Sequence, residues 1–144
     1  EGIRRIAERI RALTGVLAAG LERLGHDVLT EVFFDTVRVR PVGRTEDFLA
    51  SARDRGINLR DFGDGTVGIA LDEVTRPEDV DDLLAIFNGG EAPDFSAHAL
   101  DDDAPPPELP EWAARTSAYL EHEVFNRYHS ETEMLRYLHK LESR

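Results

Sequence analysis

The sequence predicts an α+β domain, a small antiparallel or mixed sheet with helices on one face, followed by a C-terminal helical segment. Three observations predict this fold class. Apolar residues recur at steps of three and four over residues 2–24, which is the period of a helix. Runs rich in β-branched residues over 27–40 and 59–71 then alternate with helical patterns. A sheet covered on one face is the economical packing for the order helix, strand, helix, hairpin, helix.

The first helix is expected from Gly2 to Leu24, with Gly25 ending it in a left-handed conformation. Gly15 and Gly20 lie inside it, although a glycine weakens a helix by about 1 kcal/mol relative to alanine. Either close packing against a neighbouring backbone or a bend explains these two glycines. Both explanations are structural, and neither gives the glycines a ligand.

Strand formers dominate residues 27–40, and Thr36–Arg40 alternates valine with arginine as a half-buried strand should. The next helical pattern is short. Thr45 is placed to cap it, it runs through Arg55, and Gly56 is placed to end it.

Residues 59–71 are expected to form a β-hairpin around Gly63–Gly65, because glycines supply the positive φ angles that tight turns require. A further helix follows the hairpin. Thr75 is placed to cap it, Pro77 stands in its first turn, and Gly89-Gly90 is placed to end it.

The chain is expected to divide into three parts: residues 1–90, a small α+β domain led by a long helix; residues 91–111, an acidic Pro-rich linker; and residues 112–144, a helical docking segment. The linker holds five of the seven prolines and no basic residue, which is typical of a solvated, self-repelling tether. Asp101-Asp102-Asp103 lies within it. A metal site needs rigid geometry or neighbouring His ligands, so we interpret these three aspartates as part of the tether.

The docking segment contains a strong helix start. Ser130 precedes Glu133 by three residues, the spacing of a capping box, and the helix is expected to continue to about Glu142. Its apolar face is formed by Met134, Leu138 and Leu141. An earlier helical piece is expected around Ala114–Glu123, with a break between Phe125 and Ser130.

Aromatic and aliphatic side chains are concentrated in this segment, outside the small domain. This is too much apolar surface for a free tail and indicates docking onto a partner. The candidate docking residues are Trp112, Arg115, Tyr119, Phe125, Asn126, Tyr128, His129, Met134, Leu138 and Leu141. Among them Arg115, Asn126 and His129 are the candidates for polar contacts that fix the orientation of docking.

Composition excludes several classes of function. The chain has 17 basic and 29 acidic residues and a net charge of −12, which argues against nucleic acid or an anionic membrane as a partner. It has no cysteine, so neither disulfides nor thiolate chemistry is possible. No apolar run approaches the roughly 20 residues that a membrane span requires. The first residues show neither an initiator Met nor a signal-peptide pattern, and we expect the chain to be a segment of a larger protein.

The exact sequence adds a resemblance. Residues 124–139, Val-Phe-Asn-Arg-Tyr-His-Ser-Glu-Thr-Glu-Met-Leu-Arg-Tyr-Leu-His, form a long and unusual run, and Gly25-His26, Phe33–Thr36, Gly56–Arg60 and Val67–Glu73 add to it. Together these motifs resemble the P-protein family of the glycine cleavage system. The resemblance covers most of the chain except the linker, and it identifies an internal fragment of a much longer protein.

That resemblance implies a parent enzyme, the pyridoxal-phosphate-dependent glycine dehydrogenase (decarboxylating). It implies that the parent decarboxylates glycine and passes the aminomethyl group to the lipoyl arm of the H-protein. It also implies a dimeric parent, the small domain of a fold-type-I pyridoxal-phosphate enzyme over residues 1–90, and the remainder of the P-protein as the docking partner. A cytoplasmic, bacterial location is expected.

No catalytic, cofactor-binding or metal-binding residue is assigned within the chain. Pyridoxal phosphate requires a lysine, and the only one, Lys140, is expected on the solvated face of its helix. His122, His129 and His139 fall on no single helical face, so packing or interface hydrogen bonds explain them better than a metal. The fragment is therefore expected to be structural and inactive alone. The alternative is a stand-alone acidic protein-interaction module with no enzymatic parent.

Overall fold

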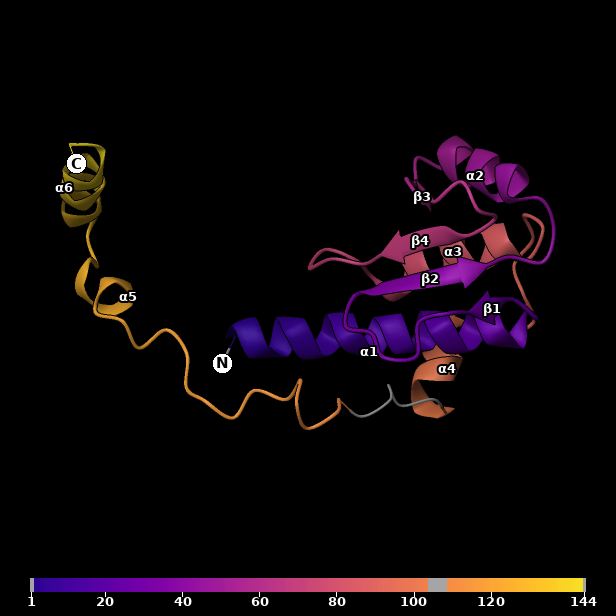
Figure 1. The fold of residues 1–144 in the computed structure, drawn as a ribbon, viewed down its shortest axis with the longest axis horizontal. Coiled ribbons are helices and arrows are strands. Elements are labelled where there is room, and N and C mark those ends of the chain that lie inside the picture. The colour runs from indigo at the N-terminus through magenta and orange to yellow at the C-terminus, as the bar shows by residue number, and fades with distance from the viewer. Residues whose placement is uncertain (1, 104–108, 144) are drawn as a thin grey trace. The chain divides into compact units, whose positions relative to one another are not determined.

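The computed structural model describes residues 2–103 and 109–143. The chain divides into two compact units, Glu1–Glu108 and Leu109–Arg144, which are described separately. In the first unit a four-stranded sheet lies against two helices (Figure 1). The fold class is therefore α+β, as the sequence predicts.

The sheet has the strand order β1-β2-β4-β3, and every neighbouring pair is antiparallel. Its strands are β1 (Asp27–Val28), β2 (Thr36–Arg40), β3 (Arg60–Asp61) and β4 (Val67–Ala70). The two central strands are in register with Val37 opposite Ile69 and Val39 opposite Val67. All four of these side chains are buried, so one face of the sheet forms the core. Arg38 and Arg40, which alternate with the valines of β2, point the other way.

Helices α1 (Gly2–Arg23) and α3 (Pro77–Phe87) cover the buried face, and α2 (Thr45–Asp54) packs beside α3. Leu17 and Leu21 of α1 meet Leu84 of α3 in a core that is continuous with the valines of the sheet. Burial of the α1 stripe begins at Leu13 and lasts to the end of the helix. The earlier turns of α1 are mostly exposed.

Glycines end these helices as expected. Gly25 has φ +89° and Gly56 has φ +73°, the left-handed region that favours glycine. The N-caps predicted for α2 and α3, however, are wrong. Arg44 is the N-cap of α2 and makes no side-chain cap bond, and Thr45 is already helical. The N-cap of α3 is Arg76, whose N–H donates to the Asp79 carboxylate at 2.7 Å.

Thr75 is not a helix cap because its hydroxyl has another partner. It donates to the Asp72 carboxylate at 2.8 Å, and the same carboxylate accepts from the backbone N–H groups of Val74 and Thr75. Thr75 therefore stabilises the turn between β4 and α3.

Close packing, one of the two explanations for the glycines of α1, holds at Gly20. A Cβ added there would lie 2.5 Å from Leu84 Cδ2 and 3.3 Å from Leu100 Cδ1. Leu100 belongs to α4 (Ala97–Asp103), so the missing side chain allows α3 and α4 to approach α1 together.

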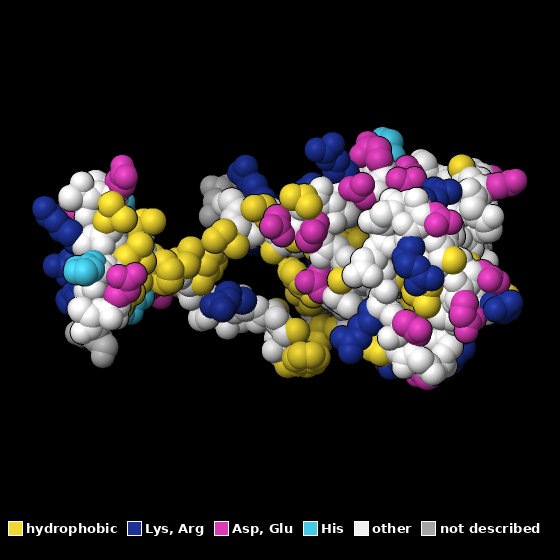
Figure 2. Space-filling view, turned by 90° about the horizontal axis from the view of Figure 1, so that it is seen from above, with side chains coloured by type: hydrophobic (Ala, Val, Ile, Leu, Met, Phe, Trp, Pro, Cys, Tyr) yellow, Lys and Arg dark blue, Asp and Glu magenta, His cyan; other side chains and the backbone are white. Residues whose placement is uncertain are grey.

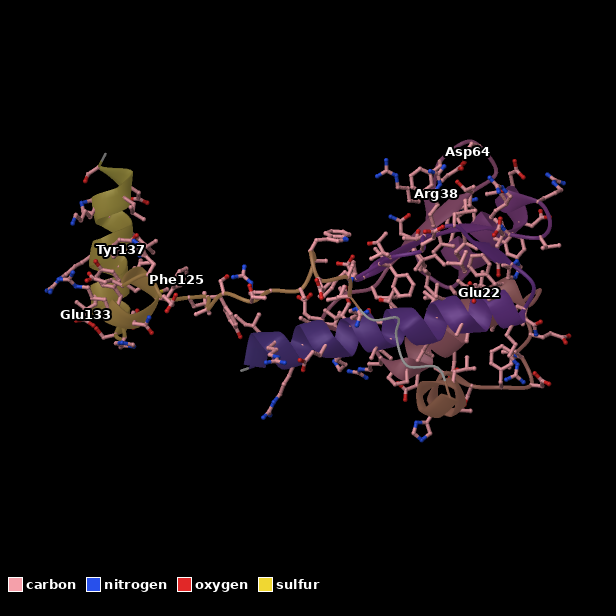
Figure 3. All side chains as sticks on the ribbon, turned by 60° about the horizontal axis from the view of Figure 1, so that its bottom comes forward. Glu22, Arg38, Asp64, Phe125, Glu133 and Tyr137 are labelled. Atoms are coloured by element: carbon pink, nitrogen blue, oxygen red, sulfur yellow. The ribbon has the colours of Figure 1, made fainter. Side chains whose placement is uncertain are left out.

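Helix α4 lies inside the range that the composition assigns to the linker. Ala97 and Leu100 are buried, and α4 packs against α1 and α3 on the side away from the sheet (Figures 1 and 3). The Asp81 carboxylate accepts a 2.6 Å hydrogen bond from the N–H of Ala97 at the start of α4. The structure therefore places residues 97–103 with the folded domain. The side chains of Asp101-Asp102-Asp103 and all of Pro105-Pro106-Pro107 lie outside the described residues.

The second unit contains α5 (Val124–Arg127) and α6 (Glu131–Glu142). Helix α6 confirms the predicted second piece. The earlier prediction of a helix over Ala114–Glu123 is wrong, because the one turn of helix before α6 lies in the expected break instead. Among residues 2–103 and 109–143, no helix is long and apolar enough to cross a membrane.

Candidate functional site

The start of α6 is fixed by the capping box that the sequence predicts. Ser130 has an extended backbone (φ −114°, ψ 153°), and its hydroxyl accepts from the N–H of Glu133 at 3.3 Å. The Glu133 carboxylate accepts in return from the N–H and the hydroxyl of Ser130. These bonds lower the pKa of Glu133, the Ser130 hydroxyl contributing most. The carboxylate at this position also suits the positive end of the helix dipole.

A chain of polar contacts holds the segment before α6. The Asn126 side-chain amide donates to the carbonyl of Leu120 at 3.1 Å, and His129 Nε2 donates to the carbonyl of Asn126 at 2.6 Å. Leu120 has φ +59°, a left-handed conformation that is strained for a residue with a bulky side chain. Two of the predicted docking residues, Asn126 and His129, therefore fix the conformation of their own segment.

Two tyrosines join the loop to the helix. The rings of Tyr128 and Tyr137 are stacked with centroids 4.5 Å apart and planes inclined by 20°. Tyr137 is labelled on α6 in Figure 3, close to Phe125 on α5. The stack orients α6 relative to the residues before Ser130 without a buried core, since no residue of α5 or α6 is buried.

The apolar side chains of this unit are left exposed. Phe125 on α5 and Met134, Leu138 and Leu141 on α6 each expose between 45% and 59% of their surface. Figure 2 shows hydrophobic side chains gathered over α5, α6 and the chain that leads into them. An exposed apolar face on a helix of three turns is typical of an element that packs onto a partner.

The remaining predicted docking residues lie before α5. Trp112 is the most exposed of the large hydrophobic side chains, at 82%. The guanidinium of Arg115 donates to the Ser117 hydroxyl at 3.2 Å and lies 5.9 Å from the centre of the Tyr119 ring. The structure thus pairs Arg115 with Tyr119, Asn126 with His129, and Tyr128 with Tyr137.

Lys140 does not fit the requirements of a cofactor lysine. Its side chain is exposed on α6, the same helix that presents Met134, Leu138 and Leu141. A lysine that forms a Schiff base needs a desolvated environment in which the amine loses its proton. The exposed Lys140 does not meet this requirement, and no catalytic step is assigned to this chain.

The three histidines of this unit make separate contacts. His122 Nδ1 accepts from the N–H of Val124 at 3.2 Å, and His139 Nδ1 lies 3.7 Å from the Glu142 carboxylate. Within the described part of the chain no three His, Cys, Asp or Glu side chains are grouped as metal ligands.

A cluster on the open face of the sheet was not predicted from the sequence. Arg38 and Arg60 lie 4.2 and 4.9 Å from the centre of the Phe62 ring. Arg38 also donates to the Asp64 carboxylate at 2.5 Å and to the Thr66 hydroxyl at 2.8 Å, and Figure 3 shows Arg38 and Asp64 together. The Thr66 hydroxyl lowers the pKa of Asp64 most, burial opposes this in part, and Arg38 lowers the pKa further.

The signal for this cluster is present in the alternation of β2. Arg38 and Arg40 alternate with the buried valines and must therefore share the open face of the sheet. The β3–β4 hairpin pairs with β2, which brings the hairpin's side chains beside them on that face. The cluster ties the β3–β4 turn to β2. Because Asp64 neutralises Arg38, we interpret it as structural.

Comparison with known proteins identifies the family. A family model described as the glycine cleavage system P-protein matches residues 1–87. A glycine dehydrogenase (decarboxylating) from Photobacterium profundum is 46% identical over 146 residues, which cover 100% of this chain and 15% of the relative. This chain belongs to the P-protein family. A second glycine dehydrogenase (decarboxylating), from Bdellovibrio bacteriovorus, is 41% identical over 143 residues, 99% of this chain and again 15% of the relative.

The chain thus spans about 15% of the length of the curated P-protein relatives that it matches. The family model covers α1 through α3. The two relatives also align with α4, α5 and α6, because their alignments extend over nearly the whole chain. Both units of the structure therefore lie within the region that aligns with these relatives.

Proposed function

We propose that this chain is a non-catalytic part of a pyridoxal-phosphate-dependent glycine dehydrogenase (decarboxylating). The parent decarboxylates glycine and passes the aminomethyl group to the lipoyl arm of the H-protein. Identity of 46% to a named glycine dehydrogenase (decarboxylating), over the whole chain, is the observation that carries this proposal. Pyridoxal phosphate supplies the electron sink for decarboxylation when it is bound by the parent.

The first unit serves as the small domain of that enzyme, and residues 112–144 dock onto the remainder of the P-protein. Three features support docking: the exposed apolar face of α6, the exposed Trp112, and the polar contacts that hold the segment in shape without a core of its own. We propose that the ten candidate docking residues named from the sequence form this contact. We further propose a dimeric parent in the bacterial cytoplasm.

The alternative, a stand-alone acidic interaction module, loses its main support through family membership. It has one discriminating consequence. A module without an enzymatic parent functions by itself, whereas a docking segment is incomplete until the rest of the P-protein is present.

The test uses the full-length polypeptide that contains these residues. Wild type is expected to exchange the carboxyl group of glycine with labelled CO2 when pyridoxal phosphate and H-protein are present. Lys140→Ala is expected to retain this activity, because its amine is solvated on α6. Leu138→Asp is expected to lower the stability of the full-length protein by about 1.5–3 kcal/mol, the value of burying one leucine.

Arg136→Asp in α6 is the matched control, because it introduces the same aspartate outside the Met134–Leu138–Leu141 face. If Leu138→Asp and Arg136→Asp have the same effect in the full-length protein, residues 131–142 do not dock through that face. If wild type with both cofactor and H-protein exchanges no CO2, the proposed activity is wrong.

A further inference from the structure

An asparagine–glycine pair lies at the end of helix α3. Asn88 is the C-cap of α3 (φ −98°, ψ 30°), and Gly89 and Gly90 follow it with φ +74° and +96°. Of the chain's three asparagines, only Asn88 is followed by glycine. The backbone nitrogen after an asparagine is a nucleophile within reach of the side-chain amide. Glycine leaves that approach open because it has no Cβ.

The nucleophilic nitrogen makes no hydrogen bond. The N–H of Asn88 donates to the carbonyl of Leu84 at 2.9 Å, and the N–H of Gly90 donates to the carbonyl of Ala85 at 2.9 Å. The N–H of Gly89, between these two, has no hydrogen-bond partner among the residues that the structure describes. Gly89 is exposed, and a Cβ added to it would meet no atom within 4 Å. Solvent therefore reaches the nitrogen that must lose its proton.

Only weak contacts restrain the amide that would be attacked. The side-chain amide of Asn88 donates to the carbonyl of Glu91 at 3.0 Å. The turn is also held by the guanidinium of Arg55, which donates to the carbonyl of Gly90 at 2.8 Å and lies 3.3 Å from the Asp82 carboxylate. These contacts are at the surface, where water replaces a lost partner at little cost. Rotation of the Asn88 backbone toward a reactive geometry is therefore accessible by local opening.

We propose that Asn88 is a site of spontaneous deamidation. The Gly89 nitrogen bonds to Cγ of Asn88, the bond from Cγ to the side-chain nitrogen breaks, and that nitrogen leaves as ammonia with the proton lost by Gly89. The product is a five-membered cyclic imide. Water then opens the imide at either carbonyl and leaves aspartate or isoaspartate at position 88. Water is the sole co-reactant, and the site does not depend on the activity proposed for the parent.

The change falls where the chain leaves α3 for α4. A carboxylate at position 88 cannot donate to the carbonyl of Glu91. It also adds a negative charge at the C-terminal end of α3, where the helix dipole is already negative. Residues 91–96 lead from this point to α4, where the Asp81 carboxylate accepts from the N–H of Ala97. Deamidation is therefore expected to loosen the packing of α4 on the first unit.

The test follows each asparagine of the 144-residue chain during incubation at mildly alkaline pH. Digestion and peptide mass spectrometry detect conversion of an amide to an acid, and an isoaspartyl methyltransferase detects the isoaspartate product. Asn88 is expected to be lost progressively. Asn58 and Asn126 are expected to keep their amides, although both are exposed, because the side chains of Leu59 and Arg127 hinder attack by the nitrogen that follows them.

A matched pair of variants tests the role of the turn. Arg55→Ala and Asp82→Ala both remove the ion pair between these residues, but only Arg55→Ala also removes the hydrogen bond to the carbonyl of Gly90. Arg55→Ala is expected to speed the loss of Asn88 about fivefold, the effect of one hydrogen bond on a local opening. Asp82→Ala is expected to keep the wild-type rate. Equal rates in the two variants would show that the Gly90 contact does not restrain the reaction.

The effect on α4 is measured with Asn88→Asp, which carries the aspartate product from the start. This variant is expected to speed amide exchange at Ala97 and Leu100, whereas Asn58→Asp is not. Unchanged exchange in Asn88→Asp would overturn the link between the modification and α4.

Two results overturn the modification site itself. If the folded chain keeps Asn88 while the urea-unfolded chain loses it under otherwise equal conditions, the fold blocks the reaction at this turn. If Asn58 or Asn126 reacts as fast as Asn88, the unbonded N–H and the missing side chain of Gly89 do not direct the reaction.

Discussion

At the residue scale, His26 joins three elements of the first unit. It is buried after the end of α1, and its Nδ1 accepts from the N–H of Val42 at 3.0 Å. A backbone N–H can only donate, so Nδ1 carries no proton and Nε2 donates to the carbonyl of Phe87 at 2.8 Å. The rings of Phe48 and Phe87 meet the imidazole edge to face. His26 thereby connects α1, the β2–α2 connection and the end of α3.

Replacing His26 by leucine is expected to lower the free energy of unfolding by about 1–3 kcal/mol, the cost of leaving a buried polar group without its partner. Urea denaturation of the whole chain measures the change. His98→Leu is the control, because His98 is exposed on α4. Equal losses in the two variants would show that the paired hydrogen bonds of His26 do not stabilise the fold.

At the element scale, the turns are held by carboxylates that accept hydrogen bonds. The pKa of Asp64 is lowered from its ordinary value of 3.8 mainly by the Thr66 hydroxyl, and the pKa of Asp72 is lowered mainly by the Thr75 hydroxyl. A carboxyl group whose pKa is lower in the folded state than in the unfolded state stabilises the folded state at pH values above its unfolded-state pKa. The stabilisation is lost as the pH falls through the lower, folded value.

Acidification below about pH 4 is therefore expected to weaken the β3–β4 turn through Asp64. Asp64→Asn should reduce stability at neutral pH and flatten the loss of stability between neutral and acidic pH. Urea denaturation at several pH values measures this slope. Glu22→Gln, a loss of one charge on the exposed side of α1, serves as the comparison and is expected to keep the wild-type slope. An unchanged slope in Asp64→Asn would mean that this carboxylate is not linked to folding.

The elements that the sequence predicts correctly are those whose signals are local. The capping box of Ser130 and Glu133 and the left-handed Gly25 depend on residues within one turn of each other. The alternation of β2 is equally local. These features are predictable because the backbone satisfies them without help from distant residues.

The wrong predictions arise where a partner that the sequence pattern does not show takes the side chain or fixes the backbone. The sequence predicts Thr75 as the cap of α3, but Asp72 takes its hydroxyl. Residues 114–123 were expected to be helical, but the chain reaches α5 through a left-handed Leu120 whose carbonyl accepts from the Asn126 side chain. For the candidate site, the sequence identifies the exposed apolar face of α6. It does not reveal the contacts of Arg38 with Phe62 and Asp64, because these depend on how the β3–β4 hairpin pairs with β2.

At the scale of the whole molecule, the first compact unit of the structure extends to Glu108, beyond the boundary at Gly90 that composition predicts. Acidic and proline-rich sequence after Gly90 suggests a tether, yet Ala97 and Leu100 are buried, and Leu100 lies beside the space that Gly20 leaves open. Two apolar side chains at a spacing of three are too few to register as a helical pattern. Their packing nevertheless holds α4 on the first unit, because α1 and α3 already form the surface that these two side chains contact.

The position of this boundary is tested by comparing chains 1–90, 1–108 and 1–144. Removing α4 exposes the surface that Leu100 covers, and the burial of that one leucine is worth about 1.5–3 kcal/mol. Chain 1–90 is therefore expected to unfold at a lower urea concentration than chain 1–108. Its free energy of unfolding should be smaller by at least this amount. Chains 1–108 and 1–144 are expected to unfold alike in the first unit, since Leu109 begins a separate compact unit.

The free energy of unfolding of the Leu100→Ala variant of chain 1–108 should lie between those of chains 1–90 and 1–108, because the variant keeps Ala97 and the Asp81 contact at the start of α4. Equal stability of 1–90 and 1–108 would instead place the end of the domain at Gly90, and the packing of α4 would then contribute nothing to the fold.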